Sequence, residues 1–422
     1  MHTMKPSVSV VIPVHNNWPL TRACLESLAS TTPSGIREVI VVDNGSSDAT
    51  PGDCPALGRQ FFGDSFRFIR FGENRNFAPA CNAGAQAAQG AFLFFLNNDT
   101  LLTPGWLDPL VSSFKDERIG AVGPLLLYPS VGPFKDRVQH LGIAFDPQFY
   151  PTHLYEFFPA RHRAVRRTRA YQALTAAAIM LRRELFLEIG GFHEEYINGG
   201  EDVDLGLKIS AVGKLLVCVP DSVVYHLASQ TPGRHKHEEH NARLLKERCL
   251  GFIKPDLLPR LRSDGYDLGL SPWLHIVLKI PEQRRRILLK RAGTCSKAEL
   301  YTLMDNEPLL MEIYDRLAEA AEQEGNLDEM LHLRLLQAKL GGQPEHYRTL
   351  LVAARRAGDE KLQTYAHGRI SFFQPEKINF SRDCAKNMQQ LYARAGQAEI
   401  AALYSGWLDR SDFFLKSYFQ GV

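Results

Sequence analysis

Cysteine pairs at the spacing of a metal site or a redox motif are missing from this sequence. Its seven cysteines are odd in number, lie far apart and never form Cys-x-x-Cys. This distribution fits neither a zinc site nor a disulfide framework. We therefore expect reduced thiols in a cytoplasmic protein.

A charge excess and a long apolar run are missing as well. Lys plus Arg number 49 and Asp plus Glu 47, so the formal net charge is only +2. A dedicated nucleic-acid binder is normally strongly basic, so we expect no nucleic-acid partner. Apolar runs such as 91–96 stay far below the roughly 18 residues of a membrane span, and the first residues do not form a signal peptide. We expect no transmembrane segment, and peripheral contact with the inner membrane stays open.

Glycine-rich phosphate loops are the third absence. No Gly-x-Gly-x-x-Gly follows the first apolar strand, and no Walker-type loop occurs. Dinucleotide oxidoreduction and P-loop hydrolysis are therefore disfavoured. A sugar-nucleotide pyrophosphorylase is disfavoured too, because the residues after the first strand do not form a glycine-rich loop with arginine and lysine.

The first part of the chain alternates short apolar strands with helices. Strands that are apolar on both faces and alternate with helices indicate a parallel sheet covered on both sides. The sequence thus predicts an α/β domain over residues 1–250. Its elements are expected as strands at 8–13, 38–43, 66–71 and 92–96, helices at 18–30 and 77–89 (the latter stopped by Gly90), a helix at 202–211 and strands near 215–219 and 223–226.

The rest of the 422 residues has a different character. We expect a linker with connecting helices over 251–295 and an all-helical domain over 296–422. Gly325, Gly358 and Gly396 recur in similar surroundings, 33 and then 38 residues apart. This echo favours tetratricopeptide-like helical hairpins over about 314–408, with Pro344 and Pro375 closing the first two units. An unrelated helical bundle is the alternative.

Polar residues follow three of the predicted strands. Ligands of an open parallel sheet bind beyond the carboxyl ends of its strands. This rule selects residues 13–16, Asp43 with Asn44, and Asn97-Asn98-Asp99. An aspartate after a strand is, taken singly, more often a turn former. Three such strand ends in one sheet favour a ligand site.

Five motifs occur in one order along the chain: SVVIPVHN at 9–16, VVDNGSSD at 41–48, NFA at 76–78 with NAG at 82–84, LNND at 96–99 and GGED at 199–202. Together they resemble glycosyltransferase family 2, the inverting GT-A enzymes, and in particular the rhamnosyltransferase-type branch that builds bacterial surface glycans. The resemblance spans about 6–248. It implies a GT-A nucleotide-diphospho-sugar transferase fold, followed here by the helical-repeat domain.

The resemblance also implies a donor site and a metal site. Asp99 matches the acid that binds a divalent metal, Mn²⁺ or Mg²⁺, while Asn97 replaces the first acid of the family's Asp-x-Asp motif. His226 matches a further metal contact, although a lone histidine is more often a surface or core residue. The implied contacts to the nucleotide sugar are Pro13, His15, Asn16, Asp43, Asn76, Asn82, Asn98, Arg234 and Lys236.

Glu201 and Asp202 match the family's catalytic acid pair, with Asp202 as the base. On a helix, Asp202 would face protein, whereas Asp204 would lie on the opposite side in a solvated pair with Lys208. The helix N-terminus favours an ionised Asp202. The alternative is that Asp202 merely caps the helix.

These assignments predict an enzyme that transfers a sugar from a UDP- or dTDP-sugar to a hydroxyl of a bacterial surface glycan or a protein. The arginine-rich stretch at 161–169 is expected to meet an anionic acceptor or a membrane surface, unless it is simply solvated. The helical repeats are expected to engage a protein partner, or else to stabilise the chain or mediate dimerisation. The competing hypothesis is an inactive, transferase-derived scaffold acting through its repeats. Retention of Asp43, Asp99 and Asp202 argues against it.

Overall fold

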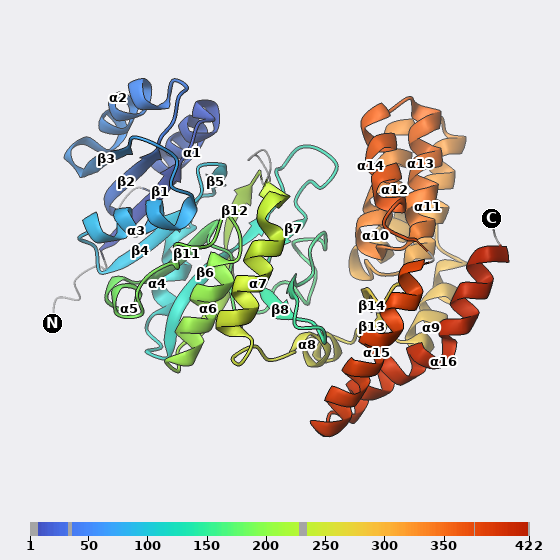
Figure 1. The fold of residues 1–422 in the computed structure, drawn as a ribbon. Coiled ribbons are helices and arrows are strands. Elements are labelled where there is room, and N and C mark those ends of the chain that lie inside the picture. Colours follow the sequence, from blue (N-terminus) through green and yellow to red (C-terminus); the bar gives the residue numbers. More distant parts are fainter. Residues whose placement is uncertain (1–6, 33–35, 228–233, 375, 421–422) are drawn as a thin grey trace. The chain divides into compact units, whose positions relative to one another are not determined.

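The computed structural model describes residues 7–32, 36–227, 234–374 and 376–420 (Figure 1). The chain divides into two compact units. The sheet unit comprises Met1–Ala144, Pro151–Glu156 and Arg163–Lys254. The helical unit comprises Phe145–Tyr150, Phe157–His162 and Pro255–Val422.

The sheet unit is built on one mixed, mostly parallel sheet with the strand order β10-β12-β6-β11-β4-β1-β2-β3. β4, β1, β2 and β3 run parallel, whereas β11 is antiparallel to both β4 and β6. β5 and β7 pair with β12 and β6 off this path. The strands are β1 (Val8–Val14), β2 (Ile36–Asn44), β3 (Phe66–Phe71), β4 (Phe92–Leu96), β5 (Thr100–Leu102), β6 (Ile119–Leu127), β7 (Val138–His140), β10 (Arg169–Tyr171), β11 (Ala178–Arg182) and β12 (Leu215–His226).

Helices cover both faces of this sheet, as the two-sided apolar strands predict. Val10 and Ile12 of β1 belong to a buried core cluster with Leu25 of α1. Val11 points to the other face, where α3 packs so closely that a Cβ added at Gly84 would lie 2.3 Å from its side chain. The helices of this unit are α1 (Trp18–Thr31), α2 (Thr50–Phe62), α3 (Phe77–Ala87), α4 (Leu107–Ser113), α5 (Arg183–Glu188), α6 (Glu201–Ala211) and α7 (Glu238–Cys249).

Two local expectations are wrong. α3 ends at Ala87, so Gly90 does not stop it. Gly90 instead donates its N–H to Ser9 Oγ at 2.8 Å, and a Cβ there would lie within 2.9 Å of Ser9. Residues 215–226 form one strand rather than two, because β12 continues through a register shift between Val219 and Val223.

The helical unit begins where the sequence predicts a linker. That stretch holds α8 (Leu257–Ser263), the hairpin of β13 (Asp267–Leu270) and β14 (Ile276–Lys279), and α9 (Glu282–Ala292). Two segments from within the first 250 residues also belong to this unit. Within it, the Phe145 N–H donates to Asp256 Oδ1 at 2.9 Å, and the Tyr392 hydroxyl donates to the Pro147 carbonyl at 2.6 Å. The short strands β8 (Ile143–Phe145) and β9 (Pro151–His153) flank the first of these segments.

The recurring glycines join consecutive helices. Gly325, Gly358 and Gly396 have φ values of 75°, 70° and 70°, a backbone region that favours glycine. The next residues, Asn326 and Asp359, each accept a backbone N–H three residues on and so cap the following helix. The helices are α10 (Lys297–Asn306), α11 (Met311–Gln323), α12 (Leu327–Gly341), α13 (Pro344–Ala357), α14 (Glu360–Ile370), α15 (Glu376–Arg394) and α16 (Ala398–Gln420).

The structure describes only one of the two prolines that were expected to close a repeat unit. Pro344 is the first residue of α13, a position where its missing N–H costs nothing. Pro375 lies outside the described residues. Within the described part of the chain, no helix has the length and apolar character needed to span a bilayer.

Candidate functional site

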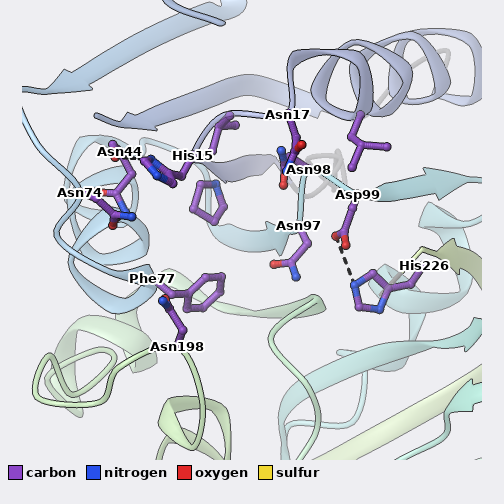
Figure 2. A pocket seen from close by; sticks show the side chains of 13 residues that line it. His15, Asn17, Asn44, Asn74, Phe77, Asn97, Asn98, Asp99, Asn198 and His226 are labelled. Carbon is purple, nitrogen blue, oxygen red and sulfur yellow. Dashed lines mark hydrogen bonds and ion pairs between the residues drawn. The ribbon is translucent and has the colours of Figure 1, made fainter. Parts of the chain in front are cut away.

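A cavity lies at the carboxyl ends of β1, β2 and β4 (Figure 2). His15, Asn44 and Asn74 lie at one end of it, and Asp99 with His226 at the other. The remaining side chains are asparagines and the apolar groups of Pro13, Val14, Leu20 and Phe77. The full lining is Pro13, Val14, His15, Asn17, Leu20, Asn44, Asn74, Phe77, Asn97, Asn98, Asp99, Asn198 and His226.

Asp99 and His226 face each other at one end of this cavity. His226 ends β12, and its partner across the ladder is Thr100 of β5, the residue after Asp99. Asp99 Oδ1 lies 3.2 Å from His226 Nε2, and both residues are buried. The other ring nitrogen, Nδ1, lies 3.2 Å from Gln139 Oε1. An imidazole held through Nδ1 presents Nε2 to a metal in many metalloproteins.

The two asparagines before Asp99 have different roles. Asn98 donates from Nδ2 to the Thr21 hydroxyl at 2.9 Å, which ties it to α1. Asn97 Oδ1 is buried without a hydrogen-bond partner among the described residues. A buried, unpaired amide oxygen in a cavity wall is costly unless a ligand or water reaches it. Asn97 is therefore placed to accept a donor from a bound ligand.

The opposite end is shaped by Asn44. Its Nδ2 donates to Asn74 Oδ1 at 2.9 Å and to the Asn76 carbonyl at 2.8 Å, so the loop after β3 is held against β2. Its own carbonyl lies 3.0 Å from His15 Nδ1. The strand-end rule selected Asn44, whereas no pattern in the sequence singled out Asn74 as its partner.

Asp43 lies beneath this end rather than in the cavity lining. It is fully buried, and its Oδ1 accepts the Ser46 N–H at 2.9 Å. Its Oδ2 lies 3.3 Å from Arg70 Nε in an ion pair. Arg70 is half-exposed, so a ligand that displaced it would reach the carboxylate.

Three other expected donor contacts hold loops instead of lining the cavity. Asn16 accepts the Ser47 N–H at 2.8 Å, and Asn76 uses its backbone to pair with neighbouring asparagines. Asn82 donates to the Phe192 carbonyl at 2.9 Å and accepts the Phe192 N–H at 3.0 Å. Lys236 is exposed, and the side chain of Arg234 lies outside what the structure describes.

Glu201 and Asp202 open α6 next to the cavity wall. Asp202 accepts the Val203 N–H at 2.8 Å and the Ala176 N–H at 3.3 Å. The following residue, Ala177, accepts the Asn97 N–H at 2.9 Å, so the backbone at 176–177 joins Asp202 to the Asn97–Asp99 turn. Glu201 is buried and accepts the Gly199 N–H at 2.7 Å. Asp202 itself is not among the residues that line the cavity.

The expectation that Asp204 is solvated is wrong. Asp204 is fully buried, with Arg248 Nε at 2.7 Å, the Tyr196 hydroxyl at 3.3 Å and Lys208 Nζ at 3.7 Å. Burial alone would raise the pKa of Asp204, but the Arg248 hydrogen bond and the neighbouring positive charges outweigh it and lower the pKa. Asp204 is buried because α7 covers the side of α6 on which it lies, and Arg248 comes from α7.

Parts of this chain are similar in sequence to known proteins. Residues 9–190 match the family model described as Glycosyl transferase family 2. The uncharacterized protein y4gI of Sinorhizobium fredii is 30% identical over 282 residues, which cover 63% of this chain and 30% of that protein. The O-antigen biosynthesis protein RfbC of Myxococcus xanthus is 32% identical over 227 residues, covering 52% of this chain and 17% of that protein.

A third relative is closer to this chain in length. It is the N-acetylglucosaminyl-diphospho-decaprenol L-rhamnosyltransferase of Mycobacterium tuberculosis, 26% identical over 309 residues, which cover 68% of this chain and 98% of that protein. The chain thus spans less than a third of the first two relatives and nearly all of the third.

The sheet unit is an α/β fold built on a mixed sheet, with its cavity at the strand ends. Residues 9–190, most of which lie in the sheet unit, are the part of the chain that is similar to glycosyltransferase family 2.

Proposed function

We propose that the chain transfers a sugar from a UDP- or dTDP-sugar to a hydroxyl group, with inversion at the anomeric carbon. The observation that carries this proposal is the polarity of the cavity. A carboxylate and an imidazole lie at one end, and a histidine with two asparagine amides lies at the other. A nucleotide sugar has the matching arrangement, with a cation-binding diphosphate next to a hydrogen-bonding nucleoside.

The residues present fit a divalent cation. Asp99 and His226 would hold it, since a carboxylate oxygen and an imidazole nitrogen already face each other at 3.2 Å. Mn²⁺ takes imidazole as well as oxygen ligands, whereas Mg²⁺ prefers oxygen alone, so this pair favours Mn²⁺. No cluster of three or more metal-binding side chains occurs among the described residues, so oxygens of the donor would complete the coordination. When bound, the cation stabilises the charge of the departing diphosphate.

Asp202 would act as the base. The hydroxyl oxygen of the acceptor attacks the anomeric carbon, the bond from that carbon to the diphosphate oxygen breaks, and the hydroxyl proton moves to Asp202. Asp202 lies in the first turn of α6, where the partial positive charge of the helix N-terminus attracts an acidic side chain. Glu201 would support the same turn through its hydrogen bond to the Gly199 N–H.

A hydroxyl of a bacterial surface glycan, or of a protein, is the acceptor that we propose. The names of two relatives support a glycan, since one is an O-antigen biosynthesis protein and the other a rhamnosyltransferase. Successive helical hairpins form an extended surface suited to a polypeptide, which supports a protein acceptor or assembly partner at the helical unit.

The direct test is a panel of UDP-, dTDP- and GDP-sugars incubated with the full-length chain and Mn²⁺. Release of a nucleoside diphosphate from one of them, faster with a hydroxyl acceptor, is expected. The matching donor should also stabilise the protein, by roughly 2.7 kcal/mol at 100 times its Kd. A purified protein that neither binds nor cleaves any member of the panel would favour the scaffold alternative.

A further inference from the structure

Asn241 is a buried residue of α7 that does not line the cavity. Its side-chain amide forms two hydrogen bonds with the backbone of a single residue, Ile197. Its Oδ1 accepts the Ile197 N–H at 3.0 Å, and its Nδ2 donates to the Ile197 carbonyl at 2.9 Å. The residue is 8% exposed, so water competes little for these two bonds. A side-chain amide paired in this way fixes both polar groups of a backbone residue.

Ile197 directly precedes the segment that joins the cavity to the acid pair. Asn198 lines the cavity and has φ 51°, a conformation that asparagine tolerates better than most residues. Gly200 has φ 95° and leads into Glu201 and Asp202. Residues 197–200 belong to no helix or strand, so their course depends on side-chain contacts such as those of Asn241.

The glycine pair of this segment lies close against Asn241. A Cβ added at Gly199 would lie 3.4 Å from Asn241 Nδ2, and one added at Gly200 would lie 3.9 Å from its Cβ. The loop therefore packs next to the Asn241 side chain, at a distance that would allow van der Waals contact.

Two further contacts hold α7 beside the same region. His240 Nε2 lies 3.1 Å from the Glu195 carbonyl, before the loop. Arg248 binds the buried Asp204 at 2.7 Å, after it. Asn241 lies between these two points, so α7 contacts the backbone before the acid pair and the helix that follows it.

We propose that Asn241 is a positioning residue for the glycosyl transfer proposed above, on which this inference rests. It fixes the backbone of 197–200, so that Asn198 faces the cavity and Asp202 stands at the first turn of α6. It touches neither donor nor acceptor.

The experiment compares Asn241→Leu, which keeps the size but removes both hydrogen bonds, with Leu245→Ala on the same helix. Leu245 is equally buried, at 8% exposure, so its truncation should destabilise α7 without removing a hydrogen bond to the loop. Asn241→Leu should lower kcat by roughly 10- to 100-fold, as expected for a misplaced catalytic group, with the Kd for UDP or dTDP near wild type. Leu245→Ala should lower Tm but keep kcat at a temperature well below its Tm.

A second readout needs no substrate. Amide hydrogen exchange at 197–200 should become faster in Asn241→Leu and stay unchanged in Leu245→Ala. In an Asp202→Asn background, Asn241→Leu should cause little further loss of kcat, because both changes act on the same group. Should Asn241→Leu fail to fold, Asn241→Ala replaces it; this variant also removes both hydrogen bonds to Ile197, leaves room for water at its polar groups and should lower kcat in the same way.

Unchanged kcat and unchanged exchange in the Asn241 variant would overturn the inference, as would equal losses of kcat in the Leu245→Ala control. The proposed function fails separately, if the wild-type chain cleaves no nucleotide sugar. Faster exchange at 197–200 in Asn241→Leu would then still support the positioning of this loop by α7.

Discussion

Asp99 and His226 depend on a very short pairing for their proximity. β5 has three residues, and its antiparallel register with β12 sets Thr100 opposite His226. Because side chains alternate along a strand, a slip of one residue would turn His226 to the other face of the sheet. Gln139 adds a second constraint, because it holds the Nδ1 side of the ring.

Asp99→Ala should weaken binding of a UDP- or dTDP-sugar far more than binding of the free nucleoside, because only the donor carries the diphosphate that shares the cation. Isothermal titration with and without Mn²⁺ measures both affinities. Asp108→Ala, which removes an exposed aspartate of α4 outside the cavity lining, is a suitable control. Transfer that is insensitive to a chelator, together with unchanged affinity in Asp99→Ala, would remove the metal from the proposal.

Asp202→Asn should lower turnover by about 10²- to 10⁴-fold, the usual contribution of a general base, and leave nucleotide affinity near normal. The amide keeps the shape of the carboxylate and an oxygen that accepts the Val203 N–H. Steady-state kinetics and nucleotide titration on the same preparation separate the two effects. Equal activity of the variant refutes the assignment, whereas lost nucleotide binding indicates a structural helix cap.

His140 gives the sheet unit a pH dependence. It is buried, accepts the Thr175 N–H at Nε2 and lies 3.0 Å from His153 Nδ1. Burial, and then the charges of His153 and His226, lower the pKa of His140 well below its ordinary value of about 6.5. Below about pH 6.5, His140 therefore binds a proton in the unfolded chain but stays neutral in the folded chain.

The contribution of His140 to the free energy of unfolding should accordingly be constant above about pH 6.5. Below that pH, protonation of His140 in the unfolded chain should lower the free energy of unfolding by about 1.4 kcal/mol per pH unit. Urea unfolding at pH 7.5 and 5.5 measures the difference. His140→Gln removes the titrating ring, so its loss of stability between these two pH values should be smaller. An identical loss in both proteins would assign the effect to other groups.

At the scale of elements, α6 is held by a close backbone contact. A Cβ added at Gly206 would lie 2.7 Å from Ala173 Cα and 2.7 Å from the Gln172 carbonyl oxygen. Alanine is the better helix former by about 1 kcal/mol. Backbone atoms cannot move aside as a flexible side chain can, so the clash should outweigh this propensity.

Gly206→Ala should therefore lower the free energy of unfolding by about 1–3 kcal/mol, as overpacking does, and reduce kcat because α6 carries Asp202. Ser210→Ala, on the exposed side of the same helix, should stay within about 0.5 kcal/mol of wild type. Urea unfolding and steady-state kinetics measure both variants. A more stable Gly206→Ala protein would mean that residues 172–173 yield to the new methyl group.

The sequence predicts an element well where neighbouring residues alone determine it, and poorly where contacts with a distant part of the chain determine it. The parallel strands of the sheet are apolar on both faces and bounded by polar turns, so their positions and the cavity at their ends follow from the sequence. Asp204 could not be predicted in the same way, because its burial comes from α7, a helix from another part of the chain. Asn241 carried no local signal either, since an asparagine within a polar helix is ordinary.

At the scale of the molecule, the chain passes back and forth between the sheet unit and the helical unit before it completes the helical unit. Residues 145–150 and 157–162 leave the sheet unit and supply buried groups to the helical unit. Phe158 lies edge-on to Tyr266 at 5.8 Å, and the Phe149 ring stacks on Tyr392 at 6.4 Å. These aromatic contacts belong to the helical unit although half of each pair precedes residue 160.

A chain ended near Arg248 should therefore be insoluble rather than a minimal transferase, because Phe145 and Phe158, now buried, would lose their partners. Expression of the truncated and full-length chains, followed by size-exclusion chromatography, measures this. Replacing the two phenylalanines by serine in the short chain should restore part of its solubility. A monomeric, folded short chain without such changes would contradict the prediction.

The same alternation limits how the helical unit can be exchanged between proteins. Joining residues 255–422 to a glycosyltransferase family 2 enzyme at a single junction would omit two segments that the helices pack against. A working chimera would need those segments grafted into the recipient's own sheet domain, between the strands that correspond to β7 and β10. The unit is thus one structural body encoded in three pieces, and only a graft of all three would transfer it.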